Sequence, residues 1–282
     1  MARPPDTASG DHFGAYGLRI GGIDGIARLL VRADPTWPRL EISVELGSAV
    51  LSEDQVDDDR GVVRFHNGGA VVIDRRRGEA VFKLPREPSP DELVHPYLAP
   101  VAAIVSRWHG HEALHAGSFL TEGGAWGLLA EREGGKSTTL ARLAIEGVPI
   151  VCDDVLVLDE ATAFAGPRAV DLREEPARVL GIGESLGMVG ARERWRLTLD
   201  AIEGKLPLLG WVFLVWGEEL ALEPVAAGAR LRRLAAQRAV RLPPSDPGAL
   251  LRLSALPGFE LRRPRHWSSL ERAVDFLMTS LP

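Results

Sequence analysis

The sequence predicts an α/β protein, with a core at residues 109–282 and a smaller β-rich domain before it at residues 13–108. Three observations lead to this prediction. Short alternating apolar runs, separated by turn-forming residues, fill the first part of the chain. An apolar run, a glycine-rich turn and an amphipathic pattern then follow one another across residues 125–146. Residues 208–216 are almost continuously apolar, as strands buried on both faces are.

The composition is that of a globular protein and narrows the functional classes. The 282 residues are 45% hydrophobic and 26% charged, enough to bury a substantial core, and a formal charge of −6 argues against nucleic-acid binding. The single cysteine, Cys152, excludes an intrachain disulfide and a multi-cysteine metal site. The N-terminus lacks the apolar segment of a signal peptide, and no apolar stretch approaches the roughly 20 residues that span a bilayer. We therefore expect a cytoplasmic protein with no nucleic-acid and no membrane partner.

The β-rich domain is expected to be a small antiparallel sheet. Residues 1–12 are rich in Pro, Asp, Ser and Gly, and we expect them to be disordered. Turn-forming clusters at Asp57-Asp58-Asp59 and Asn67-Gly68-Gly69 separate strand-like segments. The expected strands are Tyr16–Ile20, Leu40–Val44, Val62–Phe65, Ala70–Ile73 and Ala80–Phe82.

A helix is expected to link the two domains. The segment Ser89-Pro90-Asp91-Glu92 combines an N-cap serine, a proline at the first helical position and the glutamate of a capping box. Pro96 and Pro100 should kink or break this helix, which resumes towards Trp108.

The core should alternate strands and helices. Glu122-Gly123-Gly124 suits a hairpin turn between two strands, and Ser137–Glu146 has the apolar spacing of a helix that ends at Gly147. The other expected elements are strands at 114–120, 125–130, 150–158 and 208–216 and helices at 228–239 and 268–280.

Residues Ala130–Ser137 have the Walker A form of a phosphate-binding loop, with alanine in place of the usual first glycine. Gly134 and Gly135 let the backbone turn so that successive amides point at phosphates, assisted by the positive end of the following helix. Lys136 would lie along the β- and γ-phosphates of ATP, and the Ser137 hydroxyl would coordinate Mg²⁺. The alternative is a glycine-rich turn with an incidental lysine. We assign the nucleotide contacts to Glu133, Gly134, Gly135, Lys136, Ser137 and Thr138.

Two adjacent carboxylates, Asp153 and Asp154, interrupt an apolar segment after this helix. Apolar residues precede and follow them, so we expect the pair to lie within one strand. Burying carboxylates in such an apolar run costs free energy unless a cation or hydrogen-bond donors accompany them. One of the two can hold Mg²⁺ while the other accepts a proton from an attacking hydroxyl. The alternative is a solvated turn at a strand end.

A histidine before the loop, a Walker A segment and a double Asp on the next strand resemble the catalytic core of HPr kinase/phosphorylase, which is related in fold to ATP-dependent phosphoenolpyruvate carboxykinase. His115 lies fifteen residues before Ala130, and Lys136 lies seventeen before Asp153. The local patterns around His115 and at Ile150–Asp154 also match related kinases. Some of these are encoded with peptide natural-product pathways and phosphorylate a serine of a precursor peptide. The resemblance covers about Leu114–Asp159, less than a fifth of the chain.

The resemblance implies that Asp153 is the general base towards a substrate hydroxyl, that Asp154 is the magnesium partner, and that His115 lies near the transferring phosphate. Without that context, a histidine beside small residues on a strand would more often be structural. The sequence departs from the bifunctional enzymes in two respects: the Pro-Gly-Arg-Asn-like element is missing, and the N-terminal region differs from their regulatory domain. A specialised kinase relative therefore fits better than an enzyme that acts on HPr.

Arginines offer further candidates for contact with phosphate or with an acidic substrate. Arg192, Arg194 and Arg196 alternate around Trp195, and alternation on a strand would place all three on one face. An exposed basic edge strand is the competing interpretation.

Several other residues are weaker candidates. Arg168 and Arg173 follow the acidic pair and could make similar contacts. His109 and His111 form a His-x-His pair, but no third ligand is near, and a solvated helix end explains them better than a metal site. The basic segment 262–267 could contact a peptide, with no other feature to support that role.

Together these features predict an ATP- and Mg²⁺-dependent kinase that transfers the γ-phosphoryl group to a serine-type hydroxyl of a peptide or protein. The β-rich domain would offer a docking surface with an exposed edge, which favours a peptide. The alternatives are a kinase of small-molecule hydroxyls and a non-catalytic ATP-binding module that recognises peptides. Whether the chain forms a homo-oligomer is left open.

Overall fold

The computed structural model describes residues 12–23, 25–47, 54–66, 68–189, 192–240, 246 and 248–282. The sequence predicts disorder for residues 1–12, and all of them except His12 lie outside the described residues. Asn67 of the expected Asn67-Gly68-Gly69 turn also lies outside them. Gly68 beside it has a φ of 82°, a left-handed conformation that suits a turn.

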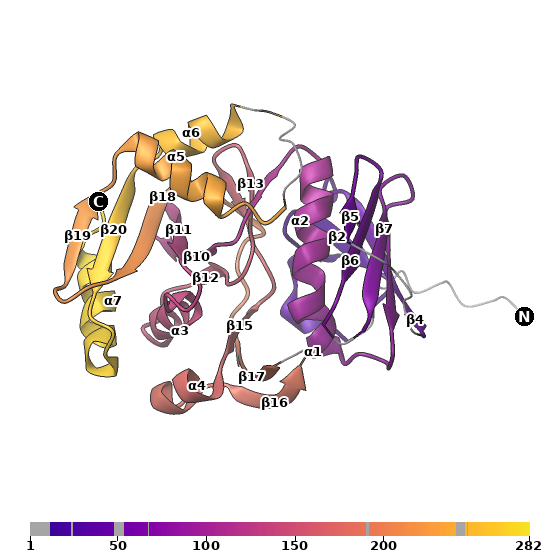
Figure 1. The fold of residues 1–282 in the computed structure, drawn as a ribbon, viewed down its shortest axis with the longest axis horizontal. Helices are drawn as coiled ribbons and strands as arrows, with labels where there is room; N and C mark the ends of the chain where they lie inside the picture. Colours follow the sequence, from indigo (N-terminus) through magenta and orange to yellow (C-terminus); the bar gives the residue numbers. More distant parts are fainter. Residues whose placement is uncertain are drawn as a thin grey trace, which may run out of the picture.

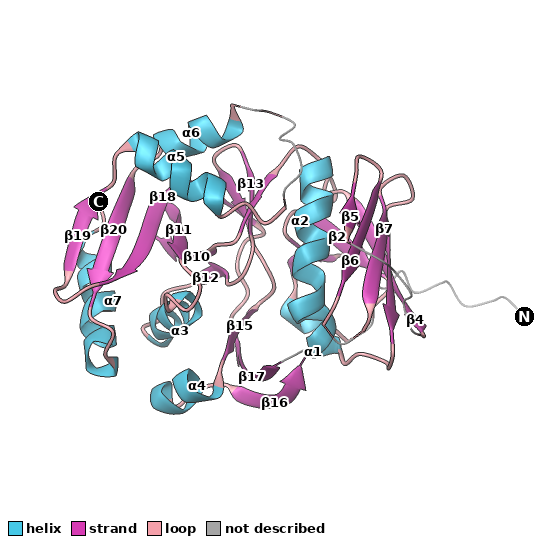
Figure 2. Ribbon diagram, viewed as in Figure 1, coloured by secondary structure: helices cyan, strands magenta, loops and turns pink. Residues whose placement is uncertain are grey.

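The fold is mixed α/β, as the sequence predicts, with the N-terminal strands on one side of the molecule and the core on the other (Figure 1; Figure 2). Among the described residues, eight strands form the N-terminal sheet in the order β3-β1-β2-β4-β8-β7-β6-β5. The expectation of an antiparallel sheet is wrong in part, because β2 pairs with β4, and β4 with β8, in parallel. Local alternation cannot reveal this, since the connections set the pairing direction. The elements are β1 (Phe13–Ala15), β2 (Leu18–Gly21), η1 (Ala27–Leu29), β3 (Val31–Arg32), β4 (Arg39–Leu46), β5 (Gln55–Val56), β6 (Arg60–Arg64), β7 (Ala70–Asp74) and β8 (Glu79–Leu84).

The linking helix begins as predicted. The Ser89 hydroxyl accepts a hydrogen bond from the Glu92 amide at 3.2 Å, and the Ser89 amide donates to the Glu92 carboxylate at 3.0 Å. These two bonds complete the capping box. The helix consists of α1 (Pro90–Glu92), a π turn η2 (Leu93–Tyr97) and α2 (Leu98–Trp108).

One of the two expected kinks is present in this helix. His95, immediately before Pro96, has an extended backbone (φ −152°, ψ 124°) inside the π turn. A following proline favours an extended backbone at the residue before it, and this residue interrupts the helical backbone at His95. Pro100 lies in the first turn of α2, where the missing amide is tolerated, so it does not break the helix.

The core sheet follows the path β12-β10-β11-β18-β14-β13-β9, and β20 pairs with both β18 and β19; these nine strands are counted among the described residues. The neighbours β11, β18 and β20 run parallel, so their C-terminal ends meet at one edge. A separate sheet, β15-β17-β16, lies beside it. The strands are β9 (Glu112–Leu114), β10 (Gly117–Thr121), β11 (Gly124–Ala130), β12 (Ile150–Cys152), β13 (Leu156–Asp159), β14 (Thr162–Phe164), β15 (Ala169–Leu172), β16 (Glu184–Val189), β17 (Arg192–Thr198), β18 (Lys205–Trp216), β19 (Ala221–Pro224) and β20 (Gly258–Arg263).

Helices cover both faces of the core sheet (Figure 1). Leu234 of α5 belongs to the same buried cluster as Leu129 of β11, whereas Leu140 of α3 belongs to the cluster of Leu128. Successive strand residues point to opposite faces, so β11 is buried between two helical layers. The helices are α3 (Lys136–Ile145), α4 (Glu174–Leu180), α5 (Ala227–Ala236), α6 (Ala249–Ala255), η3 (Trp267–Ser269) and α7 (Leu270–Ser280).

The single strand expected at 150–158 is in fact two strands. β12 pairs with β10, whereas β13 pairs with β9 and β14. Asp153 and Asp154 lie in the break between the two strands, where the chain changes neighbours. The apolar run continues across the break because both strands are buried, so periodicity alone cannot show it.

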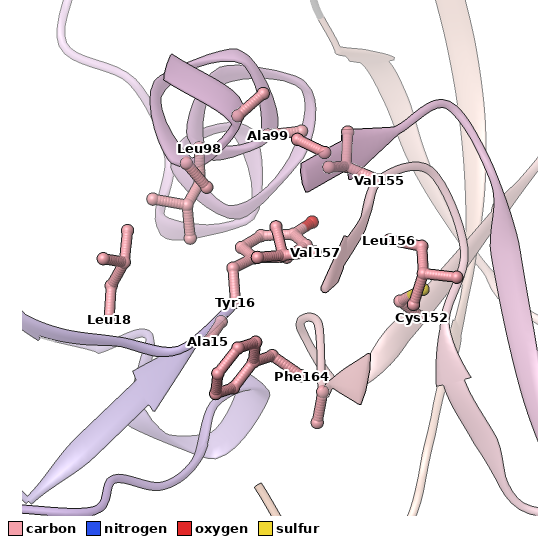
Figure 3. Packing of buried hydrophobic residues seen from close by; sticks show 14 of the residues in the cluster. Ala15, Tyr16, Leu18, Leu98, Ala99, Cys152, Val155, Leu156, Val157 and Phe164 are labelled. Carbon is pink, nitrogen blue, oxygen red and sulfur yellow. The ribbon is translucent and has the colours of Figure 1, made fainter. Parts of the chain in front are cut away.

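One apolar cluster joins the N-terminal part to the core sheet. It contains Leu18 of the first hairpin, Leu98 of α2 and Val157 of β13. Figure 3 shows the Tyr16 ring among these side chains. The Tyr16 amide donates to the Ala165 carbonyl oxygen at 2.7 Å, which fixes the hairpin against the core. The two parts therefore share buried contacts across the boundary predicted near residue 108, which itself stays a prediction.

Candidate functional site

The glycine-rich loop joins β11 to α3 at the edge where the parallel strands end. Its backbone is left-handed at Glu133 (φ 64°) and Gly135 (φ 79°). Space requires glycine at position 134, because a Cβ there would lie 2.8 Å from the Ala130 Cβ. Ala130 ends β11 without a positive φ, so alanine takes the place of the usual first glycine without backbone strain.

The loop presents the start of a helix at its end, as an anion site requires. α3 begins at Lys136, with Gly135 as the N-cap residue. The first amides of a helix have no carbonyl partner within it, and the helix dipole places positive potential there. The amides of Lys136, Ser137 and Thr138 therefore suit phosphate oxygens.

Lys136 and Ser137 lie opposite the acidic pair. The Lys136 Nζ lies 3.9 Å from Asp154 Oδ1 and 3.5 Å from the Asp154 carbonyl oxygen. The Ser137 hydroxyl donates to Asp153 Oδ1 at 2.8 Å. The structure thus brings the loop and both carboxylates together. The serine hydroxyl donates to Asp153 rather than to Asp154, the carboxylate assigned with it to Mg²⁺.

The two carboxylates have different electrostatic surroundings. Burial raises the pKa of Asp153 to about 6, although Lys136 opposes the shift. Burial would also raise the pKa of Asp154, but His95, Lys136 and His115 outweigh it and hold that pKa below its ordinary value. Asp153 can therefore exchange a proton near neutral pH, whereas Asp154 stays charged.

Two histidines flank the Asp154 carboxylate. The Nδ1 of His115 lies 3.3 Å from Asp154 Oδ1, and the Nδ1 of His95 lies 4.0 Å from Asp154 Oδ2. Burial lowers the pKa of both rings, so both are mostly neutral at pH 7. The structure places His115 beside the acidic pair, while its role near a transferring phosphate stays a prediction. His95 was missed by the sequence analysis because it comes from the linking helix, with no pattern that relates it to the loop.

A small cavity opens onto the acidic pair from the N-terminal side. Its lining includes Asp153, Asp154 and Asp171 of β15, together with His95 and Tyr16. Tyr16, expected within a strand, instead occupies the turn between β1 and β2 with a φ of 61°. Burial and the charge of Asp154 raise the pKa of the Tyr16 phenol, which therefore keeps its proton and can donate a hydrogen bond.

The arginines that were candidates for substrate contact have different surroundings. Arg192 is exposed at the start of β17. The Arg194 side chain is partly buried, 3.7 Å from Asp171. Arg196 is buried and makes two hydrogen bonds to the Asp171 carboxylate, at 2.7 and 2.8 Å. It also donates to the Asp91 carboxylate at 2.8 Å and to the Asp91 carbonyl oxygen at 3.2 Å. Because Asp91 belongs to α1, Arg196 ties β17 to the linking helix. Alternation predicts the face of a strand but not the partners on that face.

Replacing Arg196 by methionine should destabilise the fold strongly. The Asp171 side chain is only 3% exposed and would lose its main ionic partner. Breaking a buried pair in this way typically costs about 3–5 kcal/mol. Arg192→Met, on the exposed start of the same strand, should change the free energy of unfolding by less than about 0.5 kcal/mol. Urea unfolding compares the two variants, and equal stability would show that the Arg196 pairs contribute little.

The two lesser arginine candidates also have partners. Arg168 is buried and donates to three backbone carbonyl oxygens, two of them in β12, so it holds the strand that leads into the acidic pair. Arg173 is exposed and lies 3.2 Å from the Glu133 carboxylate of the loop. Only Arg173 of these two lies where it could also meet a ligand of the loop.

The two residues of the His-x-His pair differ: His109 is exposed at the end of α2, whereas the His111 side chain is packed. The His111 ring packs against Phe164, with 5.1 Å between ring centroids, and burial lowers its pKa. Within the described part of the chain, no group of three or more His, Cys, Asp or Glu side chains could hold a metal ion. Magnesium beside a phosphate loop takes phosphate oxygens and water among its ligands, so it needs fewer protein groups.

In the described ranges, no helix combines the length and the apolar character needed to cross a bilayer.

Comparisons with known proteins give matches among solved structures alone. No family model matches the sequence, and no curated protein matches it either. Among solved structures, the Hpr(Ser) kinase/phosphatase from Coxiella burnetii is similar over 60% of this chain and 94% of its own, with 13% sequence identity and a TM-score of 0.31. A TM-score this low does not establish a common fold, so the α/β class rests on the strands and helices of the chain itself.

Proposed function

We propose that this chain is an ATP- and Mg²⁺-dependent phosphotransferase that transfers the γ-phosphoryl group to a serine-type hydroxyl of a peptide or protein. The main support is the contact between the loop and the acidic pair. The Lys136 Nζ lies 3.9 Å from Asp154 Oδ1, and the Ser137 hydroxyl donates to Asp153 Oδ1 at 2.8 Å. An anion-binding loop, a lysine and carboxylates are the parts that phosphoryl transfer requires. The motif resemblance to HPr kinase/phosphorylase and to kinases of precursor peptides supports a serine-type acceptor.

On the nucleotide side, the loop residues fit a triphosphate. The amides of Lys136, Ser137 and Thr138 suit phosphate oxygens, and the Lys136 side chain, 11% exposed, can reach the β- and γ-phosphates. We propose that Ser137 and Asp154 hold Mg²⁺, because Asp154 stays charged. The ion, when bound, neutralises the charge of the phosphates.

On the acceptor side, the cavity next to the acidic pair suits a neutral hydroxyl. Asp153, with a pKa of about 6, is largely ionised at pH 7 and can still accept a proton from an attacking oxygen. Asp154 also lines the cavity, and its charge disfavours an anionic group at this point. Tyr16 and His95 also line this cavity, and their side chains could orient the acceptor oxygen.

Transfer of label from γ-labelled ATP into a lysate of the source cells tests this proposal. The purified protein, ATP and Mg²⁺ are incubated with the lysate, and the products are separated by size. Label in a peptide or protein supports the proposed acceptor class. Label in small molecules would replace that class with a metabolite. Binding of MgATP with no transfer to any fraction would favour the non-catalytic module.

The two carboxylates are distinguished by the magnesium dependence of ATP binding. Asp154→Asn should raise the Mg²⁺ concentration at which ATP binding is half-maximal by at least about tenfold. Loss of a supporting group around a metal typically weakens metal binding by a similar factor. Asp153→Asn should leave that concentration nearly unchanged. Calorimetric titration of ATP at several Mg²⁺ concentrations measures both. The reverse result would mean that the Ser137–Asp153 hydrogen bond marks the metal site and that the two carboxylates exchange roles.

A further inference from the structure

Two residues outside the Walker A pattern lie against the phosphate loop. β18 ends at Trp216 and β20 ends at Arg263, and these two residues are paired in the parallel register. Leu214, two positions before Trp216, is the partner of Ala130 at the end of β11. Trp216 and Arg263 therefore lie beyond the end of β11, at the level where the loop begins.

Arg263 is buried between the loop and the Trp216 ring. Its Nη2 donates to the Gly134 carbonyl oxygen at 2.8 Å, and its guanidinium carbon lies 4.0 Å from the centroid of the ring. Arg263 is 4% exposed, and burial lowers its pKa to about 10, so it stays protonated at neutral pH. Arg265 also lies over the ring, but at 5.7 Å and on the exposed surface.

The hydrogen bond from Arg263 fixes the direction of one peptide group in the loop. The peptide between Gly134 and Gly135 is planar and trans, so its carbonyl oxygen and its amide hydrogen point in opposite directions. A phosphate-binding loop needs its amides turned to the anion and its carbonyls turned away from it. Two consecutive glycines do not hold such an orientation by themselves, because their backbone is permissive. The Gly134 amide donates to the Glu131 carbonyl oxygen at 2.8 Å, and the Gly135 carbonyl oxygen accepts from Thr139. The guanidinium adds a restraint on the peptide group between these two contacts by holding its carbonyl oxygen.

Close packing at position 135 agrees with this arrangement. A Cβ on Gly135 would lie 2.6 Å from the Arg263 Nη2 and 3.1 Å from the Trp216 ring. Glycine is therefore required there by its φ of 79° and also by the approach of these two side chains.

We infer that Arg263 is a positioning residue for ATP binding, which holds the Gly134–Gly135 peptide so that the loop amides face the phosphates, while Trp216 orients its guanidinium. The inference rests on the proposed nucleotide-binding function. Arg263 acts through the loop and not by contact with the nucleotide. Its burial also removes it from the peptide-contacting segment considered at 262–267, where the exposed Arg265 stays available.

Calorimetric titration of the purified full chain with MgATP tests the inference. Arg263→Met keeps the length of the side chain but removes the charge and the donor. Loss of a charge-assisted hydrogen bond should weaken MgATP binding by roughly tenfold or more. Arg263→Lys, which keeps a charged donor without the planar fork, should recover part of the affinity. The control variant, Arg265→Met, should bind within about twofold of wild type.

The possible failures can be told apart. If wild-type protein does not bind MgATP, the proposed function fails. If wild type binds and Arg263→Met binds equally well, the inference about Arg263 is overturned while the function stands. Should Arg263→Met not fold, Trp216→Leu takes its place, since it removes only the ring that orients the guanidinium. That variant should bind MgATP several-fold more weakly, and wild-type affinity in it would overturn the inference.

Discussion

Asp153→Asn should lower the rate of phosphoryl transfer by roughly 10²- to 10⁴-fold, the usual contribution of a general base. Asparagine keeps the size of the side chain and can still pair with the Ser137 hydroxyl, but it cannot take a proton. The affinity for MgATP should stay within a few-fold of wild type. Initial rates of transfer from γ-labelled ATP, with calorimetry for binding, measure the two effects separately. Wild-type transfer by this variant would exclude Asp153 as the base.

The pH profile gives an independent check on the same residue. The base acts only when ionised, so with a pKa of about 6 the wild-type rate should fall about tenfold per pH unit below pH 6 and level off above it. The residual rate of Asp153→Asn should lack this step. A wild-type rate that stays constant down to pH 5 would mean that another group removes the proton.

Lys136→Ala should weaken MgATP binding and transfer together. Removing a charged donor from the phosphates should cost roughly 10- to 150-fold in affinity. Lys136 also opposes the rise in the pKa of Asp153, so its loss should move the step in the pH profile upward. Calorimetry and initial rates at several pH values measure these effects.

A matched lysine serves as the control for that variant. Lys83 is half-buried and paired with Glu45 on the N-terminal sheet, with 43% of its side chain accessible. Lys83→Ala should leave both affinity and rate unchanged. If Lys136→Ala also behaves like wild type, the loop is not the phosphate site.

The loop could be predicted from the sequence because its parts are local. The strand, the glycines, Lys136 and the following helix are consecutive, and each has its own composition signal. The same holds for the capping box at Ser89, whose two hydrogen bonds span three residues. Asp153 and Asp154 could also be found, since a double carboxylate in an apolar run is conspicuous. The break between two strands at that point could not, because it depends on a change of neighbours.

The rest of the site depends on contacts between distant segments. Tyr16 and His95 reach the acidic pair from the N-terminal part, and Arg263 reaches the loop from the end of β20. None of them stands at a spacing that relates it to the Walker A segment. Arg196 shows another limit: alternation made it a candidate for substrate contact, but it could not reveal the ion pairs that Arg196 makes with Asp171 and Asp91. Sequence periodicity identifies buried faces, whereas ionic partners across elements follow from the tertiary structure.

The apolar cluster that contains Leu18, Leu98 and Val157 bears on how ATP would be kept from hydrolysis. Separating the two parts would expose this cluster to solvent, so we expect them to move as one body. In the proposed reaction, the N-terminal part would cover the acidic pair and keep bulk water from competing with the acceptor hydroxyl. The packing of the two parts would thus favour transfer of the phosphoryl group to the acceptor over hydrolysis of ATP.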